Sequence, residues 1–157
     1  MKYDENDPLI IATIEDMISD PAKVEKLIFN IYNDIYTAGV EKMTTFYPES
    51  YFAYGQCNIY AKILTDIFGK YATAYDNTSH VITKIGDYYY DINGLYEIKE
   101  SDGNFIELPN DWLLASEMTG LGAYHPLDDD ALIEAGVNAG HKYIYEKAYG
   151  ISNEKKF

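Results

Sequence analysis

The spacing of apolar residues predicts two helices at the start of the chain. The first spans residues 8–19, with Asp7 as its N-cap and Pro8 at its first helical position. The second begins after Asp20 and is expected to end at Gly39, a residue typical of helix C-termini. We interpret both helices as scaffold. Their apolar stripes are Ile10, Ile11, Ile14, Met17 and Ile18 in the first, and Val24, Leu27, Ile28, Ile31 and Ile35 in the second.

A third helical stripe, over residues 57–69, opens with the single cysteine of the chain. Its apolar positions recur three and four residues apart, which places them on one face of a helix. The preceding residues, 40–54, sustain no period and are predicted to form a loop. The aromatic residues of that loop either pack beneath it or line one wall of a cleft. The stripe itself consists of Cys57, Tyr60, Ala61, Leu64, Ile67 and Phe68.

Alternating positions then predict an antiparallel sheet. Residues 71–75 form one expected strand, and residues 79–85 and 88–93 form two more, joined by a two-residue turn at Gly86-Asp87. This turn fixes the register, and partners across the register share a face of the sheet. The predicted core face consists of Val81, Thr83, Ile85, Tyr88, Tyr90 and Ile92. The predicted polar face consists of His80, Ile82, Lys84, Tyr89, Asp91 and Asn93.

The remaining pattern completes an α+β fold. Short strands are expected at 95–98 and 105–108, a short helix at 111–118, and a last helix from about Asp128 to Tyr149. No internal repeat or linker interrupts the chain, so we expect a single domain over residues 1–157. In this fold, the N-terminal helices and the helix that carries Cys57 pack on a small antiparallel sheet.

The composition limits the classes of molecule that we expect the protein to bind. The formal net charge is −14, and all 12 basic residues are lysines. This charge argues against nucleic acid and against an anionic membrane surface, both of which require clustered positive charge. A basic protein or peptide fits the charge better. One cysteine forms no internal disulfide, and no signal peptide or transmembrane segment is visible, so we expect a cytoplasmic protein.

The lone cysteine has two interpretations. A thiol on the first turn of a helix lies at the positive end of the helix dipole, which favours the thiolate; alternatively, Cys57 is a small buried apolar residue. A nucleophile needs a base and an orienting partner. His80 and Asp91 are diagonal neighbours on the predicted polar face, and Asn93 lies opposite His80. Taken singly, His80 and Asp91 are ordinary strand-end residues, but together with Cys57 they predict a Cys-His-Asp site. This site requires the Cys57 helix to pack against the polar face.

Two segments carry a resemblance to a known family. Tyr54-Gly55-Gln56-Cys57-Asn58-Ile59-Tyr60-Ala61 resembles the active-site cysteine segment of transglutaminases. His80-Val81, Gly86, Tyr90-Asp91 and Gly94 resemble the histidine and aspartate strands of the transglutaminase-like superfamily. The resemblance implies a papain-like fold, with Cys57 as nucleophile, His80 as base and Asp91 as the residue that orients it.

The sequence therefore supports two functions. The first is cysteine-dependent acyl transfer on a peptide or amide bond, as in a peptidase, amidase, deamidase or transglutaminase. In this enzyme Tyr54, Gln56 and Asn93 would position the substrate or hold its oxyanion. The second is an acidic interaction protein on the same scaffold, such as a phage-encoded inhibitor, with Cys57 purely structural. No cofactor is expected, and no metal, because the acidic run at 128–130 lacks the spacing of a calcium loop and complements a helix N-terminus.

Overall fold

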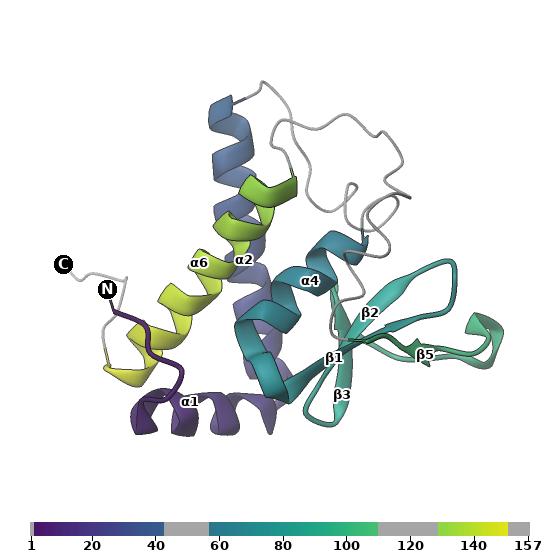
Figure 1. Ribbon diagram of the computed structural model, residues 1–157, viewed down its shortest axis with the longest axis horizontal. Coiled ribbons are helices and arrows are strands. Elements are labelled where there is room, and N and C mark those ends of the chain that lie inside the picture. The colour runs from purple at the N-terminus through teal and green to yellow at the C-terminus, as the bar shows by residue number, and fades with distance from the viewer. Residues whose placement is uncertain (1, 43–56, 110–128, 151–157) are drawn as a thin grey trace.

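The fold is α+β, with helices packed against a small antiparallel sheet (Figure 1). The computed structural model describes residues 2–42, 57–109 and 129–150. Within these ranges, α2 and α6 cross each other, α1 lies across their lower ends, and α4 lies between α6 and the sheet. The predicted class is confirmed at this level. No helix among the described residues is long and apolar enough to cross a membrane.

The first two helices bury the stripes that the sequence predicts. Helix α1 spans Pro8–Ile18, and the carboxylate of Asp7 caps it by accepting the Leu9 N–H at 2.9 Å. Helix α2 spans Pro21–Lys42, so the prediction that it ends at Gly39 is wrong. A glycine inside a helix costs only about 1 kcal/mol, which the rest of a long helix can offset.

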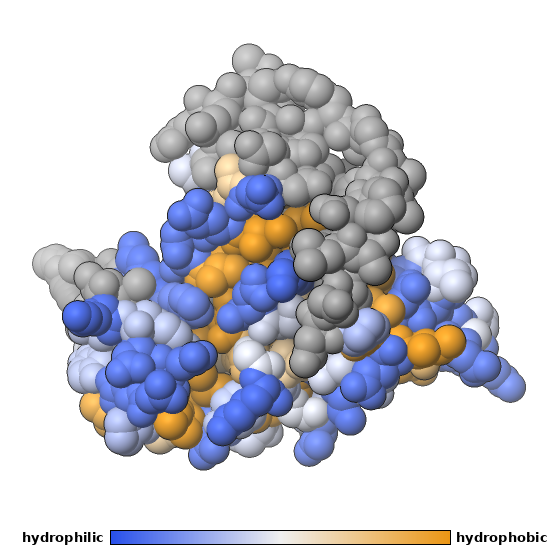
Figure 2. Space-filling view, in the orientation of Figure 1, coloured by the Kyte–Doolittle hydropathy of each residue, from blue (hydrophilic) through white to orange (hydrophobic). Residues whose placement is uncertain are grey.

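Helices α4 and α6 approach each other closely through glycines. Helix α4 spans Cys57–Phe68 and α6 spans Asp129–Ala148, near their predicted limits. A Cβ atom on Gly136 would lie 2.7 Å from Cδ1 of Ile63, and Gly140 meets Ile67 in the same way one turn later. These two glycines thus form a groove that receives two buried isoleucines. A band of hydrophobic residues runs between the two helices in the space-filling view (Figure 2).

The five-stranded sheet contains the predicted hairpin. Strand β2 spans Val81–Ile85 and β3 spans Tyr88–Asp91, and Ile85 pairs with Tyr88 across the turn as expected. Gly86 has a φ of +65°, whereas Asp87 is not among the residues with positive φ, as a type II′ turn requires. The flanking strands are β1 (Ala72–Asp76), β4 (Gly94–Tyr96) and β5 (Ile106–Glu107), in the order β4-β3-β2-β1-β5.

The chain between β4 and β5 crosses from one edge of the sheet to the other. It contains the short 3-10 helix η2, Glu100–Asp102, whereas another, η1 (Gly69–Tyr71), joins α4 to β1. The edge at β4 is covered by α2, since the Glu25 carboxylate accepts the Leu95 N–H at 2.8 Å. An occupied N–H at an edge strand discourages pairing with another chain.

Candidate functional site

Cys57 is the first residue of α4, and its half-buried sulfur lies against the start of β2. The backbone N–H of Val81 donates to Cys57 Sγ at 3.3 Å. The first N–H groups of a helix lack partners within it and carry partial positive charge. The sulfur therefore lies beside a backbone donor and at the N-terminal end of a helix.

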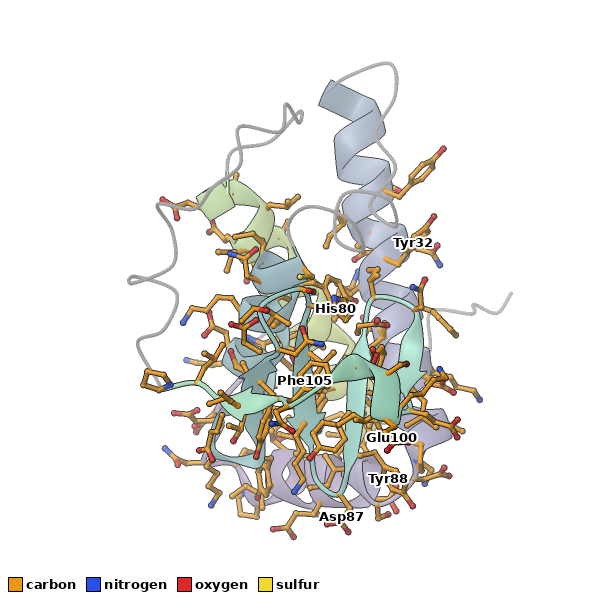
Figure 3. The ribbon with its side chains drawn as sticks, turned by 90° about the vertical axis from the view of Figure 1, so that its right-hand side faces the viewer. Tyr32, His80, Asp87, Tyr88, Glu100 and Phe105 are labelled. Atoms are coloured by element: carbon orange, nitrogen blue, oxygen red, sulfur yellow. The ribbon has the colours of Figure 1, made fainter. Side chains whose placement is uncertain are left out.

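His80 and Asp91 meet at the same end of the sheet. His80 Nε2 lies 3.0 Å from Asp91 Oδ2, and the two side chains are 18% and 12% exposed. The sequence predicts this pair, and the structure brings the two side chains together. In Figure 3, His80 lies at the end of the sheet opposite to the hairpin turn, where Asp87 and Tyr88 are labelled.

The electrostatics of this pair favour a charged imidazole. The hydrogen bond with Asp91 and a second hydrogen bond with Cys57 raise the pKa of His80 from 6.5 to about 9, against the opposing effect of burial. Because Nε2 is bound to Asp91, the nitrogen left for Cys57 is Nδ1. At neutral pH, His80 is therefore an imidazolium between a carboxylate and a sulfur.

The second oxygen of Asp91 is also occupied. Asp91 Oδ1 accepts the backbone N–H of Asn93 at 2.8 Å. This bond fixes the plane of the carboxylate, and with it the direction in which Oδ2 faces His80. Asn93 therefore supports the site through its backbone N–H. Its side chain, which was the group expected to act, is exposed.

The prediction that the Cys57 helix packs on the polar face is wrong. One small cavity is lined by Cys57 and Leu64 of α4 together with Thr83 of β2, so α4 covers the core face. The physical reason is that an apolar stripe gains more from apolar partners than from Lys84. His80 still meets Asp91, because β2 begins only after His80 and β3 ends at Asp91, so the alternation of the strand does not fix the direction of the His80 side chain. Nor is the other face polar throughout, since Ile82 is fully buried there.

Sequence reasoning missed two neighbours of His80. The ring of Tyr96 lies 5.5 Å from the His80 ring, centroid to centroid, and Asn77 Oδ1 accepts the His80 N–H at 2.7 Å. Asn77 lies between the predicted strands at 71–75 and 79–85. An asparagine in such a connection commonly accepts a backbone N–H two or three residues later, so the sequence contained a local indication of this bond. The contact of Tyr96 with His80 depends on the order of the strands in the sheet, which the local sequence does not indicate.

Tyr54 and Gln56 fall outside the described residues, as do the expected helix at 111–118 and most of the loop expected at 40–54. Residues 40–42 belong to α2, so the loop prediction is wrong there. His141 stacks on Tyr3, with ring centroids 3.9 Å apart, and takes no part in this site. Within residues 2–42, 57–109 and 129–150, no three His, Cys, Asp or Glu side chains lie together in a way that would hold a metal ion.

Comparison with known proteins corrects the family. A family model described as Phage YunG-like protein matches residues 27–130. No transglutaminase-like family was detected, and the matching family is distinct, so the transglutaminase assignment is wrong. Searches of curated proteins and of solved structures gave no match. The assignment depended on short segments around Cys57, His80 and Asp91. Similar arrangements of these residue types recur on unrelated folds, so they do not identify a family.

Proposed function

The chain belongs to the Phage YunG-like protein family, and we propose that this member is a cysteine-dependent acyl-transfer enzyme. In this proposal Cys57 is the nucleophile, His80 the acid and base, and Asp91 the residue that orients His80. The observation that carries it is the 3.0 Å bond between His80 and Asp91 beside the Cys57 sulfur. Such chemistry needs a nucleophile, a base and a third group that orients the base.

The chemistry begins from an ion pair of Cys57 and His80. The thiolate attacks the carbonyl carbon of the substrate, the S–C bond forms, and the carbonyl oxygen becomes negative. His80 then gives its Nδ1 proton to the leaving group as the bond from carbon to that group breaks. Water or another acceptor, deprotonated by His80, attacks the thioester and releases Cys57. The backbone N–H groups of the first turn of α4, which have no partner within the helix, are suitable donors for the oxyanion.

A finer fold likeness belongs to the same proposal. The chain order Cys57, His80, Asp91 and a cysteine-bearing helix against an antiparallel sheet are features of papain-like proteins. We propose this likeness for the arrangement of the site alone, and the family stays as given above.

The proposal is tested with a peptide-like electrophile, such as a peptidyl vinyl sulfone, and intact-mass detection of the adduct. We expect one adduct, mapped to Cys57, that is absent in Cys57→Ser and formed at least about tenfold more slowly in His80→Gln. Asp87→Asn, in the exposed hairpin turn, is the matched control and should label at the wild-type rate. Equal labelling of the native and the urea-unfolded protein would overturn the proposal.

The net charge favours a second candidate function. A charge of −14 without any arginine, in a phage-related family, suits a protein that binds a basic partner. In this case, binding weakens with salt and survives Cys57→Ala. The enzyme proposal expects instead that Cys57→Ala abolishes every covalent reaction.

A further inference from the structure

We propose that Asn77 and Tyr96 are positioning residues, which hold His80 from its backbone side and its ring side through a shared anchor at Asp102. This inference rests on the proposed function and identifies the residues that keep the base in place. It concerns the β1–β2 turn and the segment between β4 and β5, which lie far apart in the sequence and meet beside His80.

The first half of this clamp is the side chain of Asn77. Its Oδ1 accepts the N–H groups of Ser79 at 2.9 Å and of His80 at 2.7 Å. Its Nδ2 donates to the Asp102 carbonyl at 2.8 Å. The backbone N–H of Asn77 also donates to the His80 carbonyl at 3.2 Å. Asn77 thus binds the backbone of His80 on both sides and ties it to η2.

The second half is the ring of Tyr96. It lies 5.5 Å from the His80 ring, tilted by 52°, and it meets the ring of Phe105 edge-on at 6.1 Å. Burial raises the pKa of Tyr96, and the nearby Asp102 carboxylate raises it further through its charge and hydrogen bonding. The same carboxylate accepts the Lys99 N–H at 2.7 Å and so caps η2. Tyr96 is therefore held at its hydroxyl end while its ring lies against His80.

The two halves act on different freedoms of His80. Asn77 sets the backbone position from which the imidazole extends, whereas Tyr96 limits the rotation of the ring about its side-chain bonds. Asp91 fixes one ring nitrogen, and a second restraint is needed to direct the other nitrogen at the sulfur. A shift of about 1 Å in a reacting group can cost about 100-fold in rate, so these restraints matter for catalysis.

The turn also stores backbone strain beside the base. Thr78 has a φ of +76°, in the left-handed region that residues other than glycine rarely adopt. The Asp76 carboxylate accepts the Thr78 N–H at 2.9 Å and, with Asn77, holds this conformation. Such strain persists only where surrounding bonds over-determine it. The bonds of Asn77 are among those that do so.

The test compares two pairs of variants and one control in the full chain. Tyr96→Leu removes the ring restraint and Tyr96→Phe keeps the ring. Tyr88→Leu, at the exposed hairpin end of β3 and away from His80, is the control. Asn77→Ala removes every side-chain bond, whereas Asn77→Asp keeps acceptors for the N–H groups and loses the donor to Asp102. Two readouts are the His80 ring titration by NMR and the rate of Cys57 alkylation by iodoacetamide.

We expect Tyr96→Leu and Asn77→Ala to shift the His80 titration toward its ordinary value and to slow alkylation about tenfold. Tyr96→Phe, which keeps the ring and loses the hydroxyl, and Asn77→Asp should both be intermediate, whereas Tyr88→Leu should match the wild type. Folded Tyr96→Leu and Asn77→Asp proteins with a wild-type His80 titration would overturn the clamp. Because the titration needs no reactive cysteine, it still tests the clamp if Cys57 proves unreactive and the proposed function fails.

Discussion

His80 Nε2 lies 3.0 Å from Asp91 Oδ2, while Asp91 Oδ1 is bound by the backbone N–H of Asn93. Asp91 therefore has two effects on His80. Its charge stabilises the imidazolium, and its fixed plane sets which ring nitrogen remains for Cys57. The two effects are separable, because the first depends on pH and the second does not.

The charge effect predicts how stability depends on pH. The pKa of His80 is about 9 in the folded protein and near 6.5 when unfolded, so the folded state holds this proton more tightly. The resulting stability is fully present below pH 6.5 and is lost as the pH rises to about 9. After a reduction for partial exposure, we expect this loss to be on the order of 2 kcal/mol in the free energy of unfolding.

Urea unfolding of the wild type and of Asp91→Asn at pH 6 and pH 9.5 measures this effect. We expect Asp91→Asn to lower stability mainly at the lower pH, because the charge partner of the imidazolium is then missing. Asp87→Asn, in the exposed turn, is the control. A stability loss of the same size at both pH values would contradict the account.

His141 provides a second pH effect of opposite sign. Burial lowers the pKa of His141, whose ring stacks on Tyr3. Since the unfolded chain takes up this proton first, stability should fall as the pH drops below the ordinary value of 6.5. The charged groups that act against this burial are Glu5 and Asp66.

The variant His141→Phe keeps a ring against Tyr3 and removes the titrating group. The unfolding temperature, followed by circular dichroism, should then fall less steeply between pH 7 and pH 5.5 than in the wild type. The His80→Gln variant is the matched control, because it removes the other histidine described by the structure. Equal slopes in His141→Phe and the wild type would show that another group causes the acid loss.

The glycine groove of α6 predicts a stability effect that opposes helix propensity. A Cβ on Gly136 would lie 2.7 Å from Cδ1 and 2.9 Å from Cγ2 of Ile63, which is fully buried. Gly136→Ala should therefore destabilise the protein by about 2 kcal/mol, although alanine is the better helix former. Asn138→Ala, at an exposed position of the same helix, should be neutral or stabilising. Chemical denaturation measures both, and a stabilised Gly136→Ala protein would refute this packing.

Local chemistry allowed much of this fold to be predicted. Asp7-Pro8 marks the start of α1, Cys57 opens α4, and Gly86-Asp87 fixes the register of the hairpin. That register also brings the end of β3 beside the start of β2, where His80 and Asp91 meet as predicted. Each of these features depends on residues that are near one another in the sequence.

Features that depend on long-range packing could not be predicted. Nothing local says that β5 joins the far edge beside β1, or that Tyr96 of β4 reaches His80. The prediction of which sheet face α4 covers was wrong because it treated His80 as part of the strand alternation. Strand β2 starts one residue later, at Val81. The Val81 N–H to the sulfur was missed for the same reason, since it depends on how the helix docks.

The central claim is that His80 activates Cys57, and the pH dependence of thiol alkylation tests it most directly. The rate of iodoacetamide alkylation is measured by intact mass between pH 5 and pH 9 for the native wild type, His80→Gln and Asp87→Asn. The account predicts that the wild type and Asp87→Asn react readily near pH 6, where an ordinary thiol is slow, and that His80→Gln is at least about tenfold slower there. Equal rates for His80→Gln and the wild type across this range would contradict it.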